Sequence, residues 1–84
     1  MGYVAMVTIY PGSGLQVVIF VDDHEPAHVH VFGDGQAKIN LAGPDGEPEL
    51  IWAVGMKRND IRRAMRIVTE HQVSFLERWT EIHG

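Results

Sequence analysis

Short runs of β-branched and aromatic residues, separated by glycine- and proline-rich turns, occupy the chain up to residue 54. Residues 3–9 alternate loosely between apolar and polar side chains, whereas residues 15–21 are almost continuously apolar. Alternation is typical of a strand with one buried face, and a short continuous apolar run is typical of a strand at the centre of a sheet. The pattern therefore predicts two strands, 3–9 and 15–21, joined by a tight turn, with the second strand central.

The next two predicted strands, 28–32 and 37–41, form a hairpin around a glycine-rich turn. A two-residue turn would set Val31 against Lys38 and so mix an apolar side chain with a cation on one face. A three-residue loop removes this conflict. It gives the facing pairs Phe32 with Gln36, Val31 with Ala37, His30 with Lys38, and Val29 with Ile39. One face of the hairpin is then apolar, and the other carries His28, His30, Lys38 and Asn40.

A further strand, 49–54, and one long helix, 59–83, complete the predicted fold. In the helical segment, apolar residues recur at a spacing of three and four, which is typical of a helix with one apolar stripe. Asn59 is suited to cap its first turn. The stripe must lie on the sheet, because no other element can cover it. We therefore predict an α+β domain: a four-stranded, mainly antiparallel sheet, with 49–54 as a fifth or edge strand, and one long C-terminal helix packed on one face.

Length and composition limit the function classes. A chain of 84 residues accommodates one domain, here 1–84, with a small core, which favours sharing stability with a partner or a second copy in a homodimer. The absence of cysteine excludes disulfides, thiolate metal sites and cysteine nucleophiles. No apolar run approaches the roughly 20 residues of a membrane span, and the chain does not start with a signal-like segment. We therefore expect a cytoplasmic protein.

The chemistry that can be read from the sequence is concentrated in three of the five histidines, which fall within seven positions. His28 and His30 are two residues apart, so on a strand they project from the same face. Imidazole is the commonest neutral metal ligand and titrates near neutrality, so such a pair forms a metal site, a proton-transfer pair or a polar sheet face. The candidate ligands for a divalent metal such as zinc are His24, His28, His30 and, from the margin of the helix stripe, His71. A nearby carboxylate, Asp22, Asp23 or Glu25, supplies a further oxygen ligand or orients an imidazole.

His28 and His30 are also candidate catalytic residues. Two histidines can share the proton transfers of RNA cleavage, with Lys38 as a neighbouring phosphate site. A lysine beside a histidine lowers the pKa of the imidazole, which favours a base over an acid. So short a chain shows no sign of a deep pocket, and the sequence therefore favours a binding role over an enzymatic one and assigns no reaction.

A second candidate site is the basic start of the predicted helix. Five of the seven basic residues lie within ten positions, where the backbone N–H groups of a helix start already attract anions. These residues form either a phosphate- or nucleic-acid-binding face or an ordinary solvated helix face. The net charge of −4 and the acidic middle of the chain predict a charge dipole. The candidates are Lys57, Arg58, Arg62, Arg63 and Arg66.

Residues 23–31 read Asp-His-Glu-Pro-Ala-His-Val-His-Val, and the later helix contains His71, Phe75-Leu76 and Trp79. Both features resemble the small bacterial proteins of the family known as domain of unknown function 4160, whose motif reads Asp-His-x-Pro-Pro-His-x-His-Val. Ala27 replaces the second proline. The resemblance implies that His24, His28, His30 and His71 share one site, and that the protein is half of a toxin–antitoxin-like pair with a small protein partner encoded nearby. The alternative is a non-catalytic protein–protein interaction module.

Overall fold

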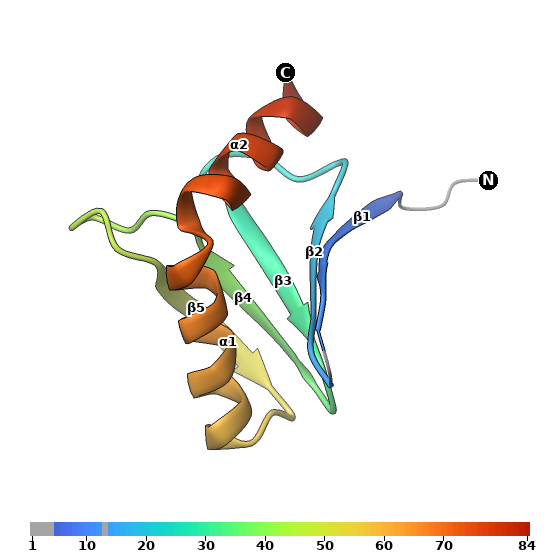
Figure 1. Ribbon diagram of the computed structural model, residues 1–84, viewed down its shortest axis with the longest axis vertical. Helices are drawn as coiled ribbons and strands as arrows, with labels where there is room; N and C mark the ends of the chain where they lie inside the picture. The colour runs from blue at the N-terminus through green and yellow to red at the C-terminus, as the bar shows by residue number, and fades with distance from the viewer. Residues whose placement is uncertain (1–4, 13) are drawn as a thin grey trace.

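The computed structural model describes residues 5–12 and 14–84. In this part of the chain, five strands are followed by two helices, α1 (Arg58–Glu70) and α2 (Gln72–His83). The strands are β1 (Met6–Pro11), β2 (Gln16–Phe20), β3 (His28–Phe32), β4 (Gln36–Asn40) and β5 (Glu49–Val54). Each strand pairs antiparallel with the next, in the order β1-β2-β3-β4-β5 (Figure 1). The predicted α+β class and antiparallel sheet are confirmed, but the sheet has five strands rather than four. The start of the predicted strand 3–9 lies outside the described residues.

The β3–β4 hairpin has the predicted register. Phe32 lies opposite Gln36 and His30 opposite Lys38, so the connecting loop has three residues. The loop also approaches the end of β5 closely: a Cβ atom on Gly35 would collide with the backbone carbonyl oxygen of Val54. The register is decided by burial, because it keeps Val29, Val31, Ala37 and Ile39 on one face, while Phe32 shares the other face with the histidines.

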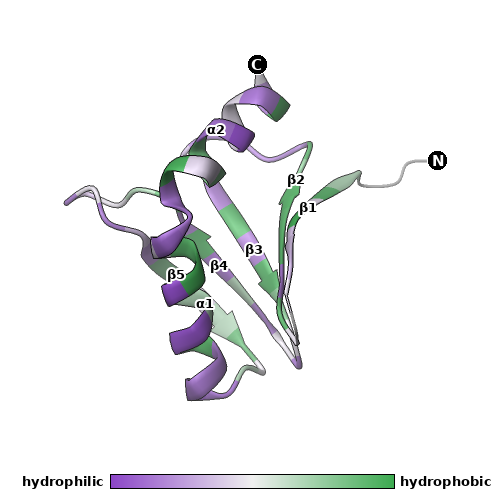
Figure 2. Cartoon of the chain, in the orientation of Figure 1, coloured by the Kyte–Doolittle hydropathy of each residue, from purple (hydrophilic) through white to green (hydrophobic). Residues whose placement is uncertain are grey.

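The helices cover a single face of the sheet (Figures 1 and 2). Alternate residues of β3, Val29 and Val31, are fully buried on this face, together with Ile39 of β4. From the helices, the core receives Ala64, Val68, Phe75 and Trp79. The amphipathic stripe therefore packs on the sheet as predicted, and the opposite face of β3 carries the histidines.

The predicted single helix 59–83 is wrong in one respect: the structure has two helices, separated at His71. His71 has φ −110° and ψ 17°, outside helical values. Just after it, the Gln72 side-chain amide donates hydrogen bonds to the carbonyl oxygens of Leu41 and Gly46, at 2.7 and 2.8 Å. These bonds tie the start of α2 to the segment after β4. Helix α1 begins at Arg58 with Lys57 as its N-cap, so the expected cap Asn59 lies inside the first turn.

In the described residues, none of the helices combines the length and the apolar character that crossing a membrane requires.

Candidate metal centre

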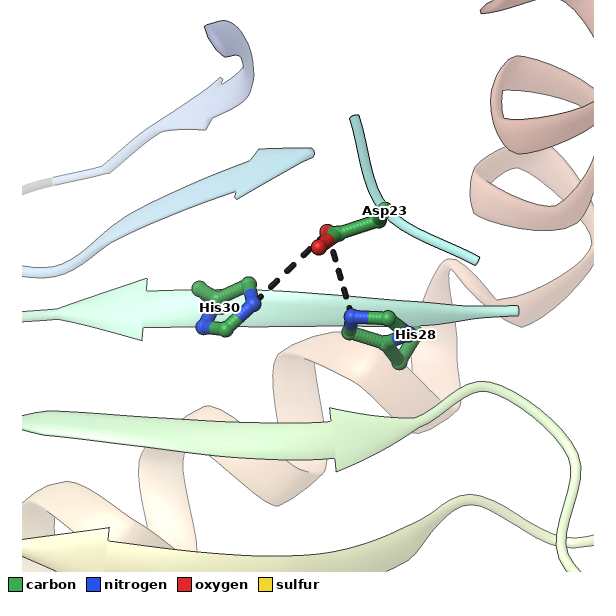
Figure 3. A group of neighbouring side chains, drawn as sticks. All are labelled: Asp23, His28 and His30. Carbon is green, nitrogen blue, oxygen red and sulfur yellow. Dashed lines mark ion pairs between the residues drawn. The ribbon is translucent and has the colours of Figure 1, made fainter. Parts of the chain in front are cut away.

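Three side chains from two neighbouring segments meet on the face of the sheet opposite α1 (Figure 3). His28 and His30 project from alternate positions of β3. Asp23 lies in the connection after β2, where its backbone N–H donates a hydrogen bond of 3.1 Å to the carbonyl oxygen of Phe20. This bond closes a four-residue turn, which carries Asp23 back over the start of β3.

The donor atoms of these side chains are spaced like the ligands of one metal ion. Asp23 Oδ2 lies 3.1 Å from His28 Nε2 and 3.6 Å from His30 Nε2, and the three ligand atoms all lie within 4.8 Å of one another. Tetrahedral zinc with bonds near 2.1 Å separates its ligand atoms by about 3.4 Å. Asp23 Oδ2 is buried and accepts no hydrogen bond from either imidazole, despite these short distances. Each contact is an ion pair when its imidazole is protonated, and when the rings are neutral the same three atoms can bind one cation.

The outer nitrogen of His28 is fixed by the backbone. Its Nδ1 lies 2.8 Å from the carbonyl oxygen of Pro26. A carbonyl oxygen only accepts, so Nδ1 carries the proton and donates, and in the neutral ring Nε2 keeps a free lone pair. A histidine that ligates a metal usually donates its other N–H to such an acceptor. The tautomer that this hydrogen bond selects is thus the one that leaves Nε2 free to bind a metal.

The environment of His30 favours a neutral imidazole. Burial lowers the pKa of His30 below its usual 6.5, and His28 and Lys38 lower it further, while Asp23 opposes the shift by raising it. His30 Nδ1 is buried and has no hydrogen-bond partner. A neutral ring presents the lone pair that a metal requires.

Aromatic side chains hold both imidazoles in place. The His30 ring meets Phe20 edge-on, with 4.7 Å between ring centroids, and Trp52 at 6.2 Å. The His28 ring lies 5.2 Å from the indole of Trp79 in α2. His28 is only 4% exposed. The two rings are therefore packed on the sheet and not free to turn in solvent.

The structure does not bring the other two predicted histidines to this group. His24 is exposed in the loop before β3. His71 packs between Tyr10 and Phe75, with ring centroids 5.4 and 5.3 Å away. Asp23 takes part instead; the sequence placed it among three nearby carboxylates but did not distinguish it from its neighbours. The distinguishing signal is structural, since it depends on the turn that follows β2.

The predicted anion-binding residues lie elsewhere. All five are exposed at the start of α1 and just before it: Lys57, Arg58, Arg62, Arg63 and Arg66. Some of them make local contacts, since Arg63 lies 3.3 Å from Asp60 and Arg62 lies 3.5 Å from Asn59. Because α1 covers the sheet face opposite His28 and His30, the basic residues and the histidines do not form one site.

The fold and this group define a small α+β protein whose antiparallel sheet carries a His–His–Asp cluster on the face opposite α1, beside Trp79 of α2. The family model described as "Domain of unknown function (DUF4160)" matches residues 14–80, which include β2 to β5, α1 and all three clustered residues. The chain belongs to this family, as the motif predicted. Comparisons with curated proteins and with solved structures found no match.

Proposed function

We propose that the protein binds one divalent transition-metal ion through Asp23, His28 and His30. The observation that carries the proposal is the position of Asp23 Oδ2, which is buried within 3.6 Å of two imidazole nitrogens and has no hydrogen bond. A buried carboxylate oxygen without a hydrogen bond is costly in an apo protein. A bound cation removes that cost by bonding to all three donors.

The donor set favours zinc or ferrous iron over magnesium or calcium. Imidazole suits zinc, iron, copper and nickel, whereas magnesium and calcium prefer sites made only of oxygen ligands. Three protein ligands leave at least one coordination position for water or another molecule, as in catalytic zinc sites. A centre with only these three protein ligands therefore keeps an open coordination position. The molecule that binds there is the one that the protein binds or acts on.

A phosphate site at the same place is less consistent with the geometry. Two histidines beside Lys38 offer positive charge when protonated, but Asp23 lies between the imidazoles and contributes a negative charge. The pKa of His30 is also lowered, so this ring loses its charge below its ordinary titration range. A carboxylate between two imidazoles attracts a cation and repels a phosphate.

The biological setting that we propose is a toxin–antitoxin-like pair in a bacterium, with a small protein partner. The motif resemblance supports this setting, and an interaction module without chemistry remains the competing proposal. A growth assay with the partner co-expressed distinguishes these two proposals. If the centre is chemical, His30→Ala abolishes any growth effect and leaves the complex intact; if the histidines serve an interface, His30→Ala breaks the complex.

Metal titration of the purified, chelator-treated protein tests the centre itself. Zinc is added while the imidazole signals are followed by NMR and the affinity is measured by calorimetry. We expect one ion per chain, joint shifts of His28 and His30, and affinity lower by about 100-fold or more in His30→Ala. His24→Ala is the matched control, because it removes an exposed histidine from the adjoining loop. Equal losses in both variants, or binding without shifts of the two rings, would refute the proposal.

A further inference from the structure

The outer strand β5 presents large apolar side chains that no other described element covers. Leu50, Ile51 and Trp52 are 38, 42 and 37% exposed, and Val54 is 65% exposed. On its inner side β5 pairs with β4, and its outer side is the edge of the sheet (Figure 1). Soluble proteins usually protect such an edge with proline, charge or a covering element, and an exposed apolar edge marks an interface.

The two edges of the sheet differ in how they are protected. Strand β1 ends in Pro11 and its pairing with β2 shifts between Thr8 and Tyr10. Proline discourages the addition of another strand, because it has no backbone N–H to donate. Strand β5 contains no proline. Both edge strands have one extra residue relative to their neighbour, so the proline is what distinguishes the two edges.

We propose that β5 pairs antiparallel with β5 of a second copy of this chain, about a two-fold axis beside Ala53, so that the two sheets become continuous. The charge distribution along the strand favours this occupant. Glu47 and Glu49 lie at its beginning, Lys57 and Arg58 follow its end, and all four are exposed. An antiparallel pair brings the acidic end of each copy beside the basic end of the other, whereas a parallel pair brings like charges together.

The start of α1 adds an independent feature in the same place. Its N-cap, Lys57, provides no side-chain hydrogen bond to the first turn. The first backbone N–H groups of a helix need an acceptor, and they favour a carboxylate. Antiparallel pairing of β5 brings the carboxylates at the beginning of one strand toward this uncapped helix start in the other copy. The dimer thus adds carboxylates to the one that Asp60 already provides in the first turn.

Sedimentation equilibrium of the full chain over a wide concentration range tests the interface. We expect a dimer for the wild type, and a dissociation constant raised by about tenfold or more in Ile51→Lys, because each copy then places a charge within the apolar interface. Val73→Lys is the matched control: Val73 is 70% exposed on α2, so the same change lies away from β5. Circular dichroism establishes that both variants fold.

Charge exchange tests the antiparallel arrangement separately. Glu49→Lys and Lys57→Glu should each weaken the dimer, and the double variant should restore it, because each exchanged charge then meets an opposite charge in the other copy. A double variant as weak as the single variants would overturn the antiparallel arrangement. A wild type that stays monomeric throughout the concentration range, or an Ile51→Lys protein that dimerises like the wild type, would overturn the interface itself.

Discussion

Replacing Asp23 by asparagine should stabilise the metal-free protein while removing its metal site. The two side chains have the same shape, so the change removes a charge and adds an amide donor. In the wild type, Asp23 Oδ2 faces His28 Nε2 at 3.1 Å without a hydrogen bond. Because His28 Nδ1 donates to Pro26, Nε2 is an acceptor in the neutral ring. An asparagine amide can donate to it, and a buried charge disappears.

The size of the effect follows from the contacts. One net hydrogen bond in a partly buried position contributes about 1 kcal/mol to the free energy of unfolding. For a domain of this length, that gain raises Tm by about 4 to 8 °C. With zinc at a hundredfold excess over its dissociation constant, the wild type gains about 2.7 kcal/mol from binding. The Asp23→Asn protein lacks the anionic ligand and should gain almost nothing.

Urea denaturation with and without zinc measures both quantities, with a chelator present in the metal-free series. Asp22→Asn is the matched control, since it removes the same charge from the exposed neighbouring position. The control should unfold like the wild type in both series. A metal-free Asp23→Asn protein that is less stable than the wild type would refute the hydrogen-bond reasoning. Full zinc stabilisation in that variant would refute the assignment of Asp23 as a ligand.

Two further predictions concern the site and the helix junction. In the metal-free protein, NMR titration should give His30 a pKa below 6.5, and Lys38→Met should raise that pKa, because Lys38 lowers it in the wild type. Since the folded-state pKa lies below the unfolded value, the stability that neutral His30 contributes is complete above pH 6.5 and is lost as pH falls through the window below it. Gln72→Ala should reduce the free energy of unfolding by about 1 to 2 kcal/mol, because the two carbonyl oxygens of Leu41 and Gly46 lose their donor. The exposed Gln36→Ala is its control in the same denaturation assay; equal effects of the two changes would contradict the role of the Gln72 amide.

The sequence was sufficient for the hairpin because burial and loop length together select its register. A two-residue turn puts Val31 and Lys38 on one face, whereas the three-residue loop keeps Val29, Val31 and Ile39 on a common face, as in the structure. The helix break at His71 left no comparable signal. The apolar stripe continues across it, and the His71 N–H still bonds to the carbonyl oxygen of Ile67. The bend depends on a tertiary contact of Gln72 that periodicity does not contain.

The sequence predicted the part of the candidate site that lies on β3, and not the part contributed by other segments. His28 and His30 share a face because alternation on one strand is a local property. The other candidates lie outside β3: His24 and Asp23 in the loop before it, and His71 between the helices. Their distances from His28 and His30 therefore depend on how that loop and the helices are placed. The turn after β2 brings in Asp23, and the ring contacts of His71 keep it with Tyr10 and Phe75.

The candidate metal centre is also joined to the hydrophobic core, which has a consequence for stability. Trp79 belongs to the core between α2 and the sheet, and its indole lies 5.2 Å from the His28 ring. A metal bound to His28 fixes that ring, and with it one contact surface of Trp79. An ion at the proposed centre would also tie the turn after β2 to β3, because Asp23 and His28 lie 3.1 Å apart. Because so short a chain has a small core, we expect metal binding to stabilise the docking of α2 as well as the histidine strand. Hydrogen exchange of the α2 amides should therefore slow on addition of zinc in the wild type and not in Asp23→Asn; equal exchange with and without the ion in the wild type would separate the centre from the core.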